Sequence, residues 1–158
     1  MIRPYRAADH DALVAITMAA FDGVSIDQNI ERLHGAIAGV GWADRKASHV
    51  DADVAAEPSG ILVWEADGRV VGYVSCRCHP ETRIGWIPNL AVHPEHQGEG
   101  IGQRLMEAAF DYLRARGMAF VRIETLEQNA RCCAWYPKLG FREVGRQIHY
   151  IRPLAEDW

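Results

Sequence analysis

The stretch that most constrains the fold joins a short strand to the clearest helix of the chain through a glycine-rich turn. Residues 90–92 are apolar and favour a strand, and residues 100–117 carry apolar side chains at helical spacing. Three alternating glycines, Gly98, Gly100 and Gly102, connect them. A strand, a helix and a following strand form a crossover unit whose strands run parallel. The sequence therefore predicts a protein of the α/β class.

The helix predicted over residues 100–117 has a continuous apolar stripe and a defined end. Arg114 and Arg116 suit the negative C-terminal end of a helix, and Gly117 is a typical residue just beyond it. Residues 120–126 alternate as a strand should. The stripe consists of Ile101, Leu105, Ala108, Ala109, Tyr112 and Leu113.

The remaining elements alternate between helices and strands. Asp67-Gly68 is a strong hairpin turn, and Asp9 is expected to cap the first helix. Pro88 lies inside a strand-forming run, so that run must lie at an edge, be bulged or diverge from its neighbour. The expected strands are 2–6, 61–65, 69–78, 84–92, 120–126 and 141–151, and the expected helices are 7–21, 25–37, 42–56, 100–117 and 129–139. This order predicts one domain, residues 1–158, with a mixed sheet and helices on both faces.

Charge and hydropathy exclude several classes of protein. The chain has 17 Lys and Arg against 21 Asp and Glu, a formal net charge of -4, and no basic block, so no nucleic-acid partner is expected. No apolar run approaches the roughly 20 residues that cross a bilayer. Residues 1–6 lack the apolar core of a signal peptide. We therefore expect a cytoplasmic protein that does not bind membranes.

The four cysteines favour reduced thiols. Cys132 and Cys133 are adjacent, a spacing that suits neither a mutual disulfide nor a zinc site. Cys76 and Cys78, followed by His79, resemble half of a metal site, but no second pair follows at the usual spacing. Without an export signal, we expect free cysteines and no bound metal.

The glycine-rich turn predicts an anion site. Glycines allow backbone N–H groups to approach a ligand closely, and the start of a helix adds positive potential. A diphosphate fits such a concavity. The spacing matches neither a P-loop, because no Gly-Lys-Ser/Thr follows, nor the G-x-G-x-x-G of dinucleotide-binding folds. The simpler alternative is a turn that only closes a tight connection.

Glu124 and Tyr136 form a candidate acid–base pair downstream of the turn. A carboxylate takes a proton from an amine, directly or through water, and a tyrosine hydroxyl donates one. The alternatives are a solvated strand residue for Glu124 and a buried tyrosine with a satisfied hydroxyl for Tyr136.

Together these segments resemble one family, the GNAT N-acetyltransferases. The six residues 97–102, Gln-Gly-Glu-Gly-Ile-Gly, match its Q/R-x-x-G-x-G/A acetyl-CoA signature, and residues 90–92 match the bulged strand before it. Asn129-Ala130-Arg131 and the run from Tyr136 to Phe141 match its C-terminal motif. The resemblance implies the GNAT fold, in which helices on both faces flank a central, mixed, mostly antiparallel and splayed sheet.

The resemblance also implies an enzyme that transfers acetyl from acetyl-CoA to a primary amine of a small molecule, peptide or protein by direct attack. Tyr136 would protonate the departing thiolate, Glu124 would accept the proton of the amine, and a backbone N–H near Val92 would stabilise the oxyanion. Asn129 would fix the cosubstrate or the splayed strands. The implied cosubstrate-binding residues are Leu90, Ala91 and Val92 for the pantetheine arm, Gln97, Gly98, Glu99, Gly100, Ile101, Gly102 and Gln103 for the pyrophosphate, and Asn129 and Tyr136.

Some positions depart from the family pattern. Ile87, Pro88 and Asn89 stand where a carboxylate is frequent, and Glu99 stands in the pyrophosphate loop, so its side chain should point outward. The family builds the acceptor site largely from the segments that correspond here to residues 21–58, which are rich in Asp and Glu, and 147–150. The acidic excess favours a cationic acceptor, or consists of ordinary solvated charges.

Two further expectations concern partners. Edge strands near the C-terminus would allow a homodimer. The alternative to an enzyme is a non-catalytic module that senses acetyl-CoA or bridges partners. Tyr136 favours the enzyme, because a sensor needs the glycine turn but no proton donor.

Overall fold

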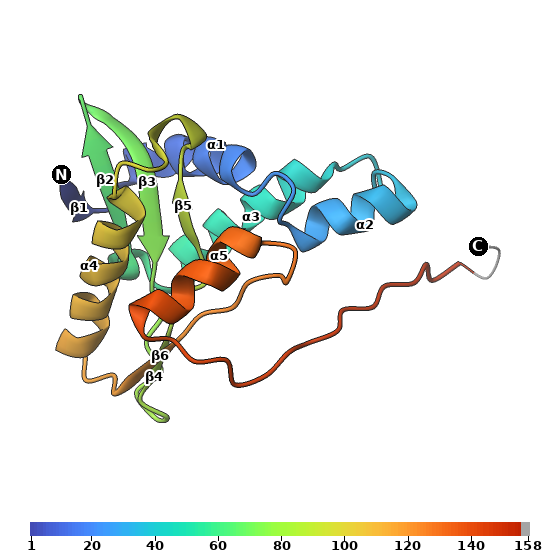
Figure 1. Ribbon diagram of the computed structural model, residues 1–158. Coiled ribbons are helices and arrows are strands. Elements are labelled where there is room, and N and C mark those ends of the chain that lie inside the picture. The colour runs from blue at the N-terminus through green and yellow to red at the C-terminus, as the bar shows by residue number, and fades with distance from the viewer. Residues whose placement is uncertain (156–158) are drawn as a thin grey trace.

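The computed structural model describes residues 1–155 and has helices on both faces of a twisted sheet (Figure 1). The strands are β1 (Ile2–Pro4), β2 (Ile61–Ala66), β3 (Arg69–Ser75), β4 (Ile84–Trp86), β5 (Leu90–Val92) and β6 (Phe120–Arg122). The helices are α1 (His10–Ala20), α2 (Ile26–His34), α3 (Trp42–Ala56), α4 (Ile101–Ala115) and α5 (Ala130–Trp135). Among the described helices, none combines the length and apolar character that crossing a bilayer requires.

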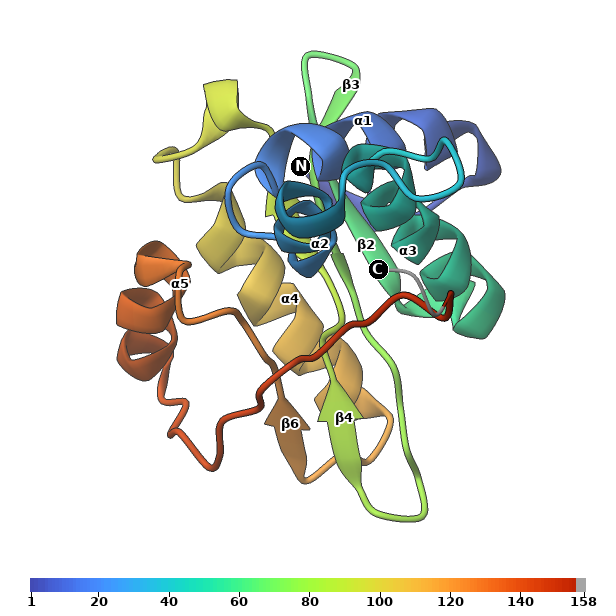
Figure 2. The ribbon, with the colours of Figure 1, turned by 90° about the vertical axis from the view of Figure 1, so that its right-hand side faces the viewer.

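The strands form two groups that diverge from each other. β1, β2, β3 and β5 pair in that order, with every neighbour antiparallel. β4 pairs with β6 in parallel (Figure 2). The helix α4 therefore connects strands of parallel direction as expected, but β6 pairs with β4 and not with β5. The predicted mixed, mostly antiparallel sheet is confirmed.

Two apolar cores lie on opposite faces of the sheet because alternate strand residues point to opposite sides. Tyr73 of β3 belongs to the core under α1 and α3, and its neighbour Val74 belongs to the core under α4. The first core also contains Leu13, Ile16, Val50, Ile61, Val63 and Ala91, and the second Val71, Cys76, Ile87, Ile101, Leu105, Met106, Ala109, Leu113 and Met118. Five of the six residues of the predicted stripe contact or form the second core.

The local signals for turns are confirmed. Asp67 and Gly68 have φ angles of 49° and 73°, the two positive values of the tight hairpin turn that such a dipeptide favours. Pro88 separates β4 from β5, so the expected strand over residues 84–92 is divided in two. Gly117, with a φ of +79°, follows the end of α4.

Three expectations were wrong in detail. Asp9 is the N-cap residue of α1 as expected, but its side chain makes no capping bond, because its carboxylate accepts bonds from the Arg3 guanidinium and from the N–H of Arg6. The strand expected over residues 120–126 ends at Arg122. Residues 141–151 form no strand within the described part of the chain, because this segment has no neighbouring strand there.

Candidate active site

The gap between the two strand groups opens at Pro88. Just before it, the N–H of Ile87 donates to the carbonyl of Arg122, the last residue of β6, at 3.0 Å. Just after it, the N–H of Ser75 in β3 donates to the carbonyl of Asn89 at 2.8 Å. Because proline has no N–H to continue the ladder, the chain changes partners at this residue. The outer edge of β5 is left unpaired among the described strands.

The backbone of β5 directs polar groups to this open edge. The N–H of His93 donates to the carbonyl of Val71 in β3 at 2.8 Å. In an antiparallel ladder, the backbone groups of successive residues point to opposite edges. The N–H groups of Leu90 and Val92 therefore point away from β3 and into the gap. An extended ligand with amide groups can pair there as an additional strand would.

Asn89 is the buried anchor of the gap. Its side-chain nitrogen donates to Asp53 Oδ2 at 2.7 Å, and its side-chain oxygen accepts from Lys46 Nζ at 3.0 Å. Arg77 donates to the other oxygen of Asp53 at 2.7 Å. Asn89 and Asp53 are 4% and 3% exposed. α3 thus fixes the strand at the residue where it changes partners.

Sequence reasoning missed Lys46 and Asp53. The available signal was their spacing, because residues 46, 50 and 53 lie on one stripe of a helix. Burial lowers the pKa of Lys46, against the opposing effect of Asp27 and Asp53. Its ammonium also lies 4.0 Å from the centre of the Phe21 ring, a favourable contact for a cation.

The glycine turn leads directly into α4. Gly98 and Gly100 have φ angles of +89° and +78°, a conformation that residues with a Cβ adopt only with strain. The first N–H groups of a helix have no partner inside it, so those at the start of α4 are available to an anion. A Cβ on Gly102 would lie 3.5 Å from the Trp135 ring, an ordinary contact, so the packing of α4 against α5 does not itself require a glycine at this position.

Gln97 connects the end of β5, before this turn, to α5. Its side-chain nitrogen donates to the carbonyl of Val92 at 3.0 Å, and its side-chain oxygen accepts from the Arg131 guanidinium of α5. The bond therefore brings a cation beside a loop that has no basic side chain of its own. In the sequence, Arg131 was recognised as part of the C-terminal motif, but no role was predicted for it. The side chain of Glu99 is 55% exposed and lies 3.4 Å from His96 Nδ1.

Asn129 and Tyr136 lie at the two ends of α5. Asn129 Oδ1 accepts from the N–H of Cys132 at 3.1 Å and so caps the helix. Its side-chain nitrogen is therefore the group available to a ligand. The Tyr136 ring packs against Trp135 and Phe141, each with its ring centroid 5.7 Å away.

The Tyr136 hydroxyl is held in its neutral form. Burial raises its pKa well above the ordinary value of tyrosine, and the nearby Cys132, Cys133 and Glu124 raise the pKa further. Glu124 follows β6 by two residues and therefore lies in a loop, not on the expected strand. Its side chain is 59% exposed, with one oxygen 3.7 Å from the Arg122 guanidinium. The fold thus brings the two candidate catalytic groups within electrostatic reach of each other.

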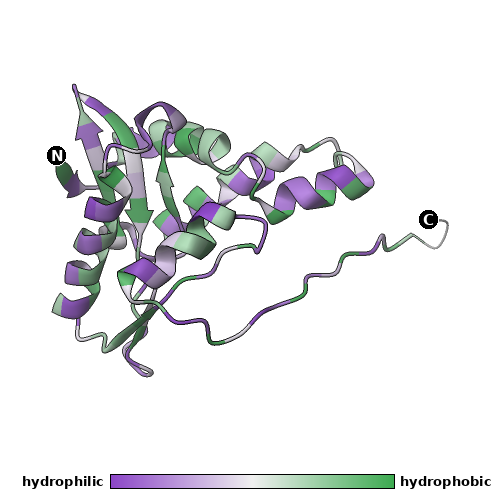
Figure 3. Ribbon diagram, in the orientation of Figure 1, coloured by the Kyte–Doolittle hydropathy of each residue, from purple (hydrophilic) through white to green (hydrophobic). Residues whose placement is uncertain are grey.

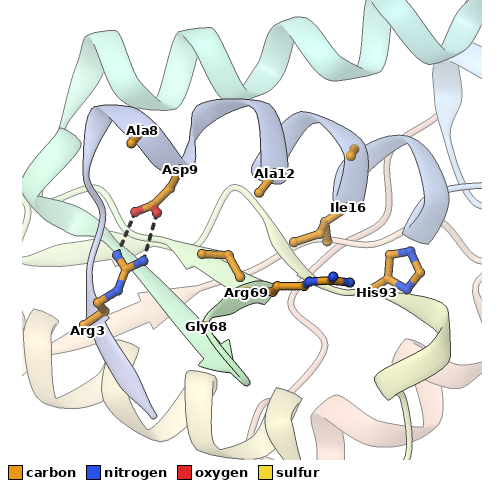
Figure 4. Close-up of a pocket in the computed structure, with 10 residues that line it drawn as sticks. Arg3, Ala8, Asp9, Ala12, Ile16, Gly68, Arg69 and His93 are labelled. Carbon is orange, nitrogen blue, oxygen red and sulfur yellow. Dashed lines mark hydrogen bonds and ion pairs between the residues drawn. The ribbon is translucent and has the colours of Figure 1, made fainter.

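A separate cavity of about 410 Å³ lies between α1 and the β2–β3 turn (Figure 4). Its wall includes Arg3, Asp9, Arg69 and His93, and the Arg3–Asp9 ion pair closes one end. None of the site residues predicted from the sequence lines this cavity. It is therefore distinct from the gap beside β5.

Metal-binding side chains do not converge in the described structure. Within residues 1–155, no group of three His, Cys, Asp or Glu side chains could hold a metal ion. The four cysteines are free thiols, and burial raises the pKa of Cys76 to about 12.

The splayed sheet, the glycine turn at a helix start and the buried tyrosine are the features expected from the resemblance to the GNAT family. The family model described as "Acetyltransferase (GNAT) family" matches residues 27–141. The chain belongs to this family.

Curated relatives include mycothiol acetyltransferases. The protein from Rhodococcus opacus is 28% identical over 95% of this chain and 54% of its own length, and that from Tsukamurella paurometabola is 33% identical over 94% and 50%. The chain thus spans about half the length of these relatives.

Solved structures confirm the fold. An N-acetyltransferase from Thermoplasma acidophilum in complex with coenzyme A has a TM-score of 0.72 at 20% identity, covering 90% of this chain and 89% of that one. The ribosomal-protein-S18-alanine N-acetyltransferase from Escherichia coli has a TM-score of 0.66 at 21% identity, covering 92% and 79%.

Proposed function

We propose that this protein transfers the acetyl group of acetyl-CoA to a primary amine. The observation that carries the proposal is the open edge of β5, with the N–H groups of Leu90 and Val92 directed into the gap. This edge leads directly to the glycine turn and the start of α4. A pantetheine arm has the amides to pair with such an edge, and a diphosphate fits the helix start.

The cosubstrate-binding residues follow from this arrangement. Leu90 and Val92 pair with the pantetheine arm, whereas the backbone groups of Ala91, also expected to bind it, face Tyr73 of β3. The diphosphate binds the backbone N–H groups of residues 98–103, with Arg131 as the adjacent cation held by Gln97. Asn129 contributes its side-chain nitrogen, because its oxygen caps α5.

The reaction is direct attack of a neutral amine on the thioester carbonyl. The bond from nitrogen to carbon forms, the bond from carbon to sulfur breaks, and the N–H of Val92 donates to the developing oxyanion. Glu124 accepts the amine proton, directly or through water. Tyr136 donates a hydrogen bond to the leaving thiolate. Because its raised pKa exceeds that of a thiol, near 8.5, Tyr136 stabilises the thiolate more than it protonates it completely.

The acidic residues of α2 and α3 give little support for a cationic acceptor. Asp27 lies 3.6 Å from Arg45, and Asp51 lies 2.7 Å from His10. Glu31 accepts from the backbone N–H of Trp42. Because these carboxylates already have internal partners, the proposal names the acceptor only as a primary amine of a small molecule, peptide or protein.

Two further elements complete the proposal. Four free thiols suit a reducing compartment, so we assign the protein to the cytoplasm. We also propose that the protein forms a homodimer.

Ligand-induced stabilisation tests the function. Acetyl-CoA at 100 times its Kd should stabilise the fold by about 2.7 kcal/mol and raise the unfolding midpoint by several degrees, whereas NADH and ATP should not. Release of free thiol on addition of amines then separates an enzyme from a non-catalytic acetyl-CoA sensor. Absence of any shift with acetyl-CoA would refute the site.

A further inference from the structure

Three side chains form a row across the sheet beside the gap. Trp86 is the last residue of β4, its Cα partner in β6 is Arg122, and an isolated bridge joins it to Arg77 on the other side. The guanidinium carbon of Arg77 lies 5.0 Å from the centre of the Trp86 ring, and that of Arg122 lies 4.7 Å from it. The indole ring thus contacts one guanidinium from each neighbouring segment. We call these three residues the Arg–Trp–Arg row.

The row lies on the face of the sheet opposite to α4. A Cβ on Gly85 would lie 2.7 Å from a side chain of α4, so the next residue, Trp86, faces the other side. Val121 and Ile123 pack against the core under α4, so Arg122 between them also faces away from this helix. Hydrophobic and hydrophilic residues alternate at the start of the segment that leads from β6 to α5 (Figure 3).

This face is the one from which an acceptor reaches the thioester. In the proposed function, on which the inference rests, the diphosphate binds the start of α4, so acetyl-CoA occupies the α4 side of the gap. The acceptor amine then comes from the other face. Glu124, the proposed base, has one carboxylate oxygen 3.7 Å from the Arg122 guanidinium and so stands at the end of the Arg–Trp–Arg row.

The charges of the row differ in how they are compensated. Arg77 donates to the buried carboxylate of Asp53 at 2.7 Å. The side chain of Arg122 is 55% exposed, and its acidic partner within residues 1–155 is Glu124, too distant for a hydrogen bond. When Glu124 accepts the proton of the amine, it becomes neutral and Arg122 loses that partner. A carboxylate on the acceptor replaces it, in the kind of pair that arginine forms most strongly.

We propose that the acceptor is a free α-amino acid whose carboxylate binds Arg122. One carbon separates the amine of such a molecule from its carboxylate, and the site presents a carboxylate and a guanidinium 3.7 Å apart to match them. The amine nitrogen takes the acetyl group, its proton passes to Glu124, and the bond from carbon to sulfur breaks. The products are the N-acetylated amino acid and CoA with a free thiol. Trp86 packs against the guanidinium, a favourable contact for a cation.

Matched amines test the class of acceptor. The standard amino acids and their carboxamides, which keep the amine but lose the negative charge, are supplied to the full chain with acetyl-CoA, and free thiol is measured. After correction for the fraction of neutral amine, kcat/KM for at least one amino acid should exceed that for its carboxamide by about tenfold or more. Equal use of acid and carboxamide in every pair, or no turnover of any amino acid, would overturn the inference.

Arg122→Gln tests the residue. The variant keeps a polar side chain but removes the charge, so the ratio of kcat/KM for the acid to that for the carboxamide should fall about tenfold, and Arg122→Lys should restore part of it. Arg114→Gln, an exposed residue of α4 on the opposite face, is the matched control and should leave the ratio unchanged. A loss that is equal for acid and carboxamide would show a structural role and contradict the assignment.

Binding measurements distinguish this inference from the proposed function. Calorimetric titration of the accepted amino acid into protein saturated with CoA should give a dissociation constant about tenfold higher in Arg122→Gln than in the parent. Absence of stabilisation by acetyl-CoA would refute the proposed function itself. Stabilisation by acetyl-CoA together with thiol release from amines that lack a carboxylate, and none from amino acids, would overturn only the identity of the acceptor.

Discussion

The side-chain amide of Asn89 donates a hydrogen bond of 2.7 Å to Asp53 and so joins the splayed strand to α3. The two residues are 36 positions apart and both are buried. Lys46 completes the contact from the same helix. In our proposal, α3 therefore fixes the position of the strand beside the gap that receives the pantetheine arm.

Removing the Asn89 side chain should destabilise the fold. Asn89→Ala leaves Asp53 and Lys46 each without one buried partner, and a hydrogen bond to a charged group contributes about 1.5–3 kcal/mol. We expect the free energy of unfolding in urea to fall by about 2–3 kcal/mol. Glu107→Ala, on the exposed face of α4, is the control and should change it by less than about 0.5 kcal/mol. Equal effects of the two variants would contradict the anchoring role.

Tyr136→Phe should separate chemistry from binding. Removal of the hydroxyl takes away the donor to the departing thiolate, while the ring still packs against Trp135 and Phe141. We expect turnover to fall about 100-fold, within the range of general acid catalysis. The acetyl-CoA dissociation constant, measured by calorimetry, should change little. Turnover equal to that of the parent would remove Tyr136 from the mechanism.

Arg131→Ala should weaken acetyl-CoA binding. The guanidinium lies beside the glycine turn through its bond to Gln97, where it faces the charge of the diphosphate in our proposal. We expect the dissociation constant to rise about tenfold, with a weaker dependence on salt. Arg114→Ala is the matched control, because Arg114 is exposed and pairs only with Asp111 among the described residues. Identical affinity in both variants would refute this assignment.

The Arg3–Asp9 pair should make stability depend on acid pH. The Arg3 hydrogen bonds lower the pKa of Asp9 in the folded state, against the opposing effect of burial. The folded carboxyl therefore binds protons less readily than the unfolded one, whose pKa is near 3.9. The stabilisation is fully present above that value and is lost as pH falls through the lower folded pKa. In Asp9→Asn, the urea midpoint should lose this acid dependence, and a parallel pH profile would contradict the role of the pair.

Several parts of the fold follow from local sequence signals. Asp67-Gly68 specifies its turn because both residues tolerate positive φ angles, which L-residues with larger side chains avoid. Pro88 interrupts the ladder because it lacks an N–H. The glycine turn and the apolar stripe of α4 were predicted for the same kind of reason: each depends on residues close together in the chain.

Contacts between distant residues were not predictable in this way. The helix spacing of Lys46 and Asp53 places them on one stripe, but nothing nearby indicates that Asn89 lies against it. Arg131 had no assigned role until the packing of α5 brought it to Gln97. The roles of Glu124 as the base and of Tyr136 as the donor to the thiolate stay predictions.

The C-terminal segment separates the two kinds of information. Its alternating apolar residues determine that residues 141–151 are suited to an extended strand, because that pattern is a property of the chain itself. A strand also needs a neighbouring edge, and only the tertiary structure decides which edge is in reach. Here Phe141 packs against Phe110, and within the described residues the segment that follows it pairs with no strand. Sequence thus determined the local conformations, whereas tertiary structure decided their partners, because pairing depends on positions in space that no local pattern encodes.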